Sequence, residues 1–236
     1  MPRELRFLQE LAREARLNPD LFDALGEDDF IFFTQACRKH AQHHAKRSPL
    51  HGEGLLMVHP FYRMVEAIHL DLPDAAEKRG MMNMRAAAES ASGAMPVALI
   101  DDFPSYALAS SGLAEDGLVD YVVFTRNWDP SPMRPHEAEN LHWLSRAFLC
   151  GCYGGGRCLS YYFTELYRPN ANSAIHIKDA ILYSPRGPLK KLDTEFERQY
   201  IERVGITTDA FVALASGYVE PRISAPGPLP AASLSP

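Results

Sequence analysis

The chain has 236 residues, of which 46% are hydrophobic and 23% are charged. These are the proportions of an ordinary globular protein, so they exclude a disordered or fibrous chain and favour one main domain. The formal net charge of -6 gives no attraction to phosphate backbones or anionic lipid, so neither nucleic acid nor a membrane is an expected partner. Without an apolar run of about 18 residues or a signal peptide, we expect a cytoplasmic protein.

The first part of the chain, residues 1–50, is predicted to be an N-terminal helical extension. Leu5, Leu8 and Leu11 repeat at helical spacing, and a longer helix is expected from about Glu27 to Lys46. His40 and His44 lie one turn apart on that helix, as helical metal ligands do. The flanking arginines and lysines oppose a cation, so a solvated helix end is the competing interpretation.

Residues 54–216 are predicted to form an α/β domain, because short apolar runs alternate with helical stretches from Gly54 onward. The expected strands are 55–59, 97–101, 121–125, 147–152 and 174–177, the last continuing toward residue 182. The expected helices are 61–69, 73–92, 106–111, 136–145, 158–167, 193–204 and 207–215. The remaining residues, 217–236, are rich in proline and small residues, and we expect a disordered tail there.

The strands are nearly continuous apolar runs, such as VALI and YVVF. Such runs indicate burial on both faces of the sheet. The predicted fold class is therefore α/β, a Rossmann-like three-layer α/β/α sandwich with a mostly parallel sheet of about five strands, preceded by the N-terminal helices.

Ligands of open parallel sheets bind in the crevice beyond the carboxyl ends of the strands. His59 ends the first predicted strand, Asp101 and Asp102 end the second, Arg126 follows the third, and the 151–158 turn follows the fourth. We therefore expect a small, anionic molecule to bind at this edge.

The 151–158 turn is rich in glycine and leads from a strand into a helix. Gly151, Gly154, Gly155 and Gly156 permit close approach of a ligand, and the N–H groups that open the helix favour an anion. Cys158 is expected in the first turn of that helix, where the helix dipole and Arg157 would lower its pKa and prepare a nucleophile. A ligand cradle without a nucleophile and a purely structural tight turn are the alternatives.

Two further interpretations of these residues stay open. Cys150, Cys152 and Cys158 could bind zinc together with His136 or His142, although the cysteine spacing is unusual for zinc. Asp101 and Asp102 could supply a general base or a metal ligand, or Asp102 could cap the next helix. We predict no metal site.

Three segments in chain order resemble the isochorismatase-like cysteine hydrolases, the superfamily that includes nicotinamidases. They are ALIDDF (98–103), VVFTRNWDP (122–130) and LCGCYGGGRC (149–158). The resemblance implies that Asp101 is a general base and that Cys158 attacks an amide or related carbonyl carbon. The family's catalytic lysine has no counterpart, because no lysine occurs from Arg79 through Ser173. Arg126 is the residue considered for the missing positive charge.

Two functional hypotheses follow from the sequence. The first is a small-molecule-binding protein that acts as a thiol-dependent hydrolase at Cys158. The second is a non-catalytic scaffold or assembly protein with an α/β core, motivated by the lack of a complete catalytic motif. Whether the protein is an enzyme, which cofactor it uses and whether it forms a homo-oligomer are left open by the sequence.

Overall fold

The computed structural model describes residues 6, 8–10, 13–14, 27–44, 52–67, 70–126, 132–139, 141, 144–164, 173–185 and 191–217. The predicted C-terminal tail lies outside these residues beyond Gly217, and so do residues 45–50, which include the expected end of the long N-terminal helix. That helix, α3, spans Glu27–His44. No described helix is both long enough and apolar enough to span a bilayer.

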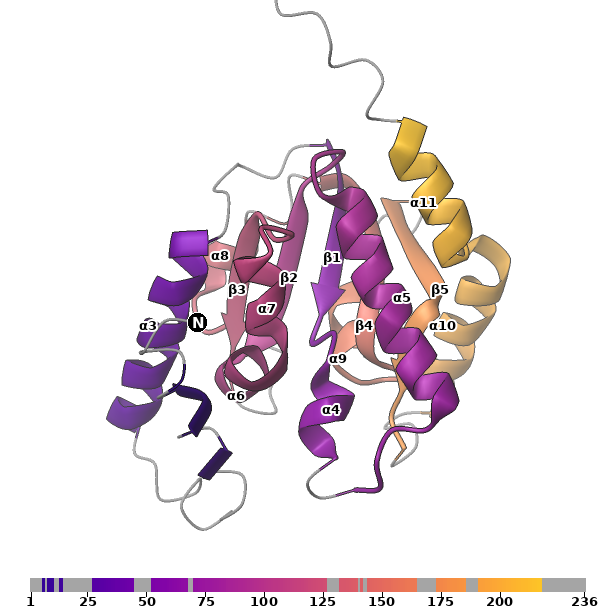
Figure 1. The fold of residues 1–236 in the computed structure, drawn as a ribbon. Coiled ribbons are helices and arrows are strands. Elements are labelled where there is room, and N and C mark those ends of the chain that lie inside the picture. The colour runs from indigo at the N-terminus through magenta and orange to yellow at the C-terminus, as the bar shows by residue number, and fades with distance from the viewer. Residues whose placement is uncertain are drawn as a thin grey trace, which may run out of the picture.

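The centre of the fold is a five-stranded sheet in the order β3-β2-β1-β4-β5, in which every pair of neighbouring strands is parallel (Figure 1). The predicted α/β class and parallel sheet are therefore confirmed. The strands are β1 Gly52–Val58, β2 Val97–Asp102, β3 Tyr121–Thr125, β4 Leu144–Gly154 and β5 Ala174–Tyr183.

Helices cover both faces of the sheet and enclose two apolar cores. The first core packs against α3, α4 (Tyr62–Glu66), α5 (Ala75–Ala91), α6 (Phe103–Ser105), α7 (Ser111–Glu115) and α11 (Thr208–Gly217). The second packs against α9 (Cys158–Tyr162) and α10 (Lys191–Val204). In Figure 1, α5 crosses in front of the sheet and α9 lies behind it. A short helix, α8 (Pro135–Glu139), precedes β4.

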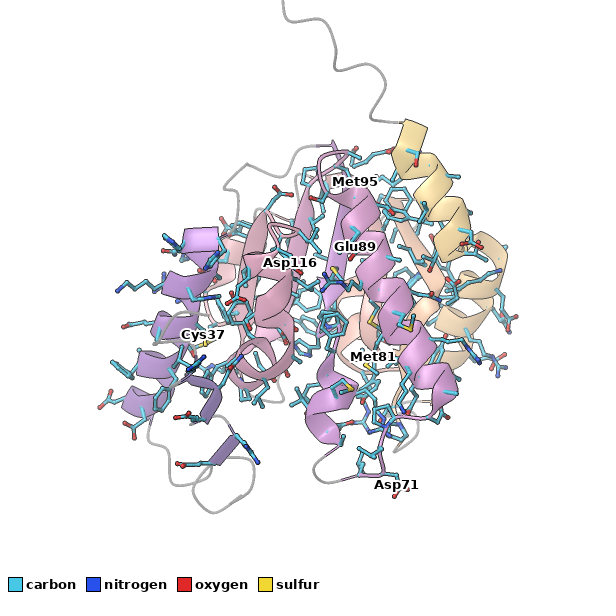
Figure 2. The ribbon with its side chains drawn as sticks, viewed as in Figure 1. Cys37, Asp71, Met81, Glu89, Met95 and Asp116 are labelled. Atoms are coloured by element: carbon cyan, nitrogen blue, oxygen red, sulfur yellow. The ribbon has the colours of Figure 1, made fainter. Side chains whose placement is uncertain are left out.

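The alternation of side chains along β2 decides where its terminal aspartates point. Val97 and Leu99 belong to the first core, whereas Ala98 and Ile100 belong to the second. Successive residues of a strand face opposite sides, so Asp101 lies on the face of the first core and Asp102 on the face of the second. The charge of Asp101 acts on the Cys37 thiol of α3, and Figure 2 shows Cys37 on the side of α3 that faces the domain.

Several predicted bounds differ from the structure, among them those of two helices. The helix expected over 136–145 ends at Glu139, and β4 already begins at Leu144, because Leu144 joins the second core as a strand residue. The helix expected over 106–111 begins earlier, at Phe103, and continues through a π-helical turn at Tyr106–Ser110 into α7.

Candidate active site

The strand order changes direction between β1 and β4. From β1 the chain adds β2 and β3 on one side of the sheet, and then adds β4 and β5 on the other. Ligand sites of open α/β sheets lie outside the carboxyl ends of the strands at such a switch point. His59 leaves β1 at this place, and the glycine-rich turn leaves β4 beside it.

Gly151 and Gly154 make close packing against the neighbouring strands possible at the end of β4. Gly151 has a φ of +127°, and a Cβ there would lie 2.0 Å from the Val58 carbonyl oxygen of β1. A Cβ at Gly154 would lie 2.9 Å from the Tyr183 ring of β5. Packing within the sheet therefore accounts for glycine at both positions, beside the predicted role in ligand binding.

The next two glycines form the turn itself. Gly155 and Gly156 have φ values of +77° and +83°, which glycine adopts without steric cost. The Gly155 N–H donates to Glu197 Oε2 at 3.0 Å, and the Gly156 N–H donates to Ser160 Oγ at 2.8 Å. Side chains of the protein thus already accept from the N–H groups of two glycines that were predicted to bind a ligand.

Asp102 lies on the same face of the sheet as α9. It is the N-cap of α6, where its Oδ1 accepts from the Ser105 N–H at 2.8 Å. Its register partner on β3 is Thr125, whose Oγ1 lies 3.1 Å from His59 Nε2. Asp102, Thr125 and His59 therefore form a buried polar group at the carboxyl edge, and the capping alternative for Asp102 is confirmed.

Asp101 is buried on the opposite face, with 0% of its surface exposed. Its Oδ1 accepts from the Asp102 N–H at 3.0 Å. Burial, with the neighbouring Asp102 charge, raises the pKa of Asp101 well above its ordinary value. Asp101 also helps to raise the pKa of Cys37, although burial is the larger cause. The Asp101 carboxyl therefore favours the protonated, neutral form.

The expected low pKa of Cys158 is not found. Burial, followed by the Asp102 charge, raises the pKa of Cys158 to about 12, although Arg157 and the Cys158 backbone N–H oppose this. The expectation was wrong because it counted only the nearby helix and Arg157. Desolvation and a carboxylate from another strand outweigh them. Cys158 is thus a protonated thiol at neutral pH.

His59 is a buried residue with a φ of +44°. Burial lowers the pKa of its imidazole, and the Asp102 charge only partly opposes this. His59 is therefore neutral at neutral pH and takes part in hydrogen bonding rather than supplying a positive charge.

The cationic side chains at this edge are placed differently. Arg126 follows β3 and is exposed, whereas Arg157 is half-buried directly before Cys158. The Arg157 charge acts on the Cys158 thiol. Of the two predicted arginines, Arg157 is therefore the one whose charge reaches the thiol.

Within the described residues, no group of three histidine, cysteine or acidic side chains is arranged to hold a metal ion. Cys150 and Cys152 lie in the first core, whereas Cys158 packs against the second. His40 and His44 do share a helix face, with ring centroids 4.6 Å apart. His40 Nδ1, however, lies 2.9 Å from the Tyr106 hydroxyl.

Four polar residues that contact the predicted site residues or one another were missed in the sequence: Thr125, Ser160, His176 and Glu197. Thr125 ends a predicted strand, so its register with Asp102 was a usable signal. Glu197 and His176 carried no such signal, because the packing of α10 against β5 is what brings Glu197 to the turn and beside His176.

No family model and no curated protein matches the sequence. Solved structures similar to the chain include the MAR1 ribonuclease from Caenorhabditis elegans, with 13% identity and a TM-score of 0.42 over 80% of this chain and 100% of that one. The YcaC gene product from Escherichia coli, described as an octameric hydrolase of unknown specificity, has 12% identity and a TM-score of 0.47 over 69% and 78%. A proposed isochorismatase hydrolase from Oleispira antarctica has 12% identity and a TM-score of 0.41 over 68% and 96%.

The similar structures thus include a proposed isochorismatase hydrolase. They also include a ribonuclease. At such identities and TM-scores, none of these names assigns an activity to the chain.

Proposed function

We propose that the protein is a thiol-dependent hydrolase that acts on an amide or a similar carbonyl compound at the carboxyl edge of the sheet. One observation carries the proposal. Among the four cysteines, all of them free thiols, Cys37, Cys150 and Cys152 are buried, and Cys158 alone is partly exposed. Cys158 also lies on the Asp102 face, where the charge of that residue acts on its thiol.

In the proposed reaction, the Cys158 sulfur attacks the carbonyl carbon while the thiol proton moves to a carboxylate of the Asp101–Asp102 pair. That carboxyl then gives the proton to the leaving amine or alcohol, and a thioester remains on Cys158. Water attacks the thioester, loses its proton to the same carboxylate and releases the acid, and the thiol regains the proton. Because the free thiol is protonated, its deprotonation accompanies the attack.

Both aspartates belong to the proposed base. The family resemblance implies Asp101, whereas the charge of Asp102 acts more strongly on Cys158. Two adjacent carboxyl groups that interact hold one proton between them more readily than two separate carboxylates do. The raised pKa of Asp101 supports an arrangement in which Asp101 holds this proton and Asp102 carries the charge.

The substrate is proposed to be small and anionic, with Arg126 and Arg157 as the side chains that meet its negative charge. The proposed compartment is the cytoplasm, since the reaction needs a reduced thiol. Assembly into a homo-oligomer stays a prediction, which sedimentation of the full chain would test.

Replacement of Asp102 by asparagine is expected to increase alkylation of Cys158 while it decreases hydrolysis. The negative charge of Asp102 raises the thiol pKa, so its removal lowers that pKa and increases the thiolate fraction at a given pH. We expect roughly a three- to tenfold faster reaction with iodoacetamide, since one pKa unit is a factor of ten. In the wild type, the rate should rise about tenfold per pH unit between about pH 7 and about pH 10.

Peptide mass spectrometry would follow each cysteine separately in that experiment. Asparagine also caps helices well, so the Asp102 variant should fold. Asp116→Asn is the matched control, since Asp116 is exposed and pairs with Arg85. If Cys158 in Asp102→Asn were alkylated at the wild-type rate or more slowly, the proposed effect of the Asp102 charge on the thiol would be contradicted. If no hydrolysis were found with any amide or ester, the scaffold hypothesis would be favoured.

A further inference from the structure

A buried carboxylate on α10 holds the turn that carries Cys158. Glu197, with 3% of its surface exposed, accepts with Oε2 from the Gly155 N–H at 3.0 Å and from the Ser160 hydroxyl at 2.5 Å. Ser160 Oγ in turn accepts from the Gly156 N–H at 2.8 Å. We call these three hydrogen bonds the Glu197 latch.

The latch encloses Cys158 in the sequence. Two of its bonds hold the glycines before the cysteine. Ser160, which accepts from Gly156 and donates to Glu197, lies two residues after it. Glycines with positive φ have many alternative conformations, so the turn needs such external contacts to adopt one of them. Because Glu197 belongs to α10, its bonds to Gly155 and Ser160 tie the start of α9 to that helix.

The carboxylate in the latch is poorly solvated. Burial raises the pKa of Glu197, although its hydrogen bonds with Ser160 and Gly155 oppose this. Its Oε1 has no hydrogen-bond partner and lies 3.9 Å from His176 Nε2. Burial lowers the pKa of His176 to about 3, so this histidine is neutral and supplies no charge to balance the carboxylate.

Packing alone gives no reason to keep an uncompensated carboxylate there, because buried charges are costly. The donors that it accepts from are all part of the turn or of α9. We propose that Glu197 is a positioning residue that sets the Cys158 thiol toward Asp102. This inference rests on the proposed function, in which Cys158 is the nucleophile.

Glu197→Ala is expected to release the turn without unfolding the domain. Hydrogen bonds to charged groups are strong, so their loss should increase hydrogen exchange at the Gly155 amide by roughly tenfold or more. Alkylation of Cys158 by iodoacetamide should rise by a similar factor, because the released thiol is more accessible and better solvated. Cys37, Cys150 and Cys152 should stay protected, and they report on global unfolding in the same sample.

Two further variants make the experiment decisive. Glu195→Ala is the matched control, since Glu195 lies on the same helix but is exposed and contacts only Arg198 and Gln199 among the contacts described. Glu197→Gln keeps an acceptor oxygen but loses the charge, so its effects should lie between those of the wild type and Glu197→Ala. If Glu197→Ala did not fold, the same measurements on Glu197→Gln would test the proposal instead. Unchanged Gly155 exchange in Glu197→Gln would then overturn the proposal.

A pH profile separates positioning by a charged group from simple packing. As the pH falls through the pKa of Glu197, the protonated carboxyl becomes a weaker acceptor, so protection of the Gly155 amide should decrease. The titratable groups that face Glu197 from β5 are His176 and Tyr183, whose own pKa values are lowered and raised respectively, so neither titrates in that range. The decrease should be absent in Glu197→Gln, and its persistence there would contradict the role of the charge.

These measurements use the full chain and need no substrate. If the Glu197 variants behave as expected but no hydrolysis depends on Cys158, the proposed function fails and the latch still holds the turn. If hydrolysis depends on Cys158 but the Glu197 variants match Glu195→Ala in exchange and alkylation, the latch proposal alone fails.

Discussion

Replacement of Cys158 by alanine is expected to abolish hydrolysis of any amide or ester that the wild-type chain turns over. The sulfur forms the covalent bond to the carbonyl carbon, and no other described cysteine is exposed enough to replace it. Loss of a covalent nucleophile reduces turnover by roughly a thousandfold or more. The measurement is a turnover assay of both proteins against a panel of small amides and esters with anionic groups.

Cys150→Ala provides the matched control for that assay. Cys150 is fully buried in β4, and burial is the one cause that raises its pKa. Its replacement should cost about 1 kcal/mol of stability and leave turnover intact. Mass spectrometry of wild-type protein quenched during turnover should also find the acyl group on Cys158. Turnover retained by Cys158→Ala would refute the mechanism.

The Gly151→Ala variant is expected not to fold. An alanine Cβ would lie 2.0 Å from the Val58 carbonyl oxygen and 2.8 Å from the Val58 carbonyl carbon and nitrogen. These are backbone atoms of the neighbouring strand, so they cannot move away without disruption of the β1–β4 ladder. The φ of +127° adds strain for any residue with a side chain. We expect a loss of more than ~4 kcal/mol, measured by urea unfolding or as absence of soluble protein.

Two other glycines separate the steric clash from the backbone strain. Gly93 has a φ of +84° with open space around its Cβ position, so Gly93→Ala should cost roughly 1–2 kcal/mol from strain alone. Gly112, in α7, has open space and no positive φ, so Gly112→Ala should be neutral or stabilising by up to about 1 kcal/mol. A Gly151→Ala protein as stable as Gly93→Ala would contradict the close approach of β1 and β4.

The strands could be predicted because their signal is local. Tyr121–Thr125 has the predicted bounds, since an uninterrupted apolar run in a buried parallel strand needs no distant information. Boundaries were less predictable where tertiary contacts override local preference. β4 begins at Leu144 because this side chain packs in the second core, although the sequence around it is compatible with a helix.

The candidate site was predictable only in part. Topology brings His59, Asp102 and the 151–158 turn to one edge, because the carboxyl ends of parallel strands meet there. The shift of the Cys158 pKa was predicted in the wrong direction. Its two largest causes, burial and the Asp102 charge, depend on the tertiary structure. The contact between Glu197 and Gly155 joins residues far apart in the sequence, so no local sequence pattern predicts it.

The position of β1 has a consequence for how the chain folds. β1 is the central strand, and its Leu55 pairs with Phe148 of β4. Because β4 follows β2 and β3 in the chain, it is synthesised after both of them. Pairing of residues so distant in sequence is slow, because the intervening loop must be ordered first. Until β4 arrives, one edge of a strand whose last four residues, Leu55 to Val58, are apolar lacks its partner. We therefore expect β1 to be the segment through which newly made chains associate wrongly, and chaperones that bind apolar strands to act there.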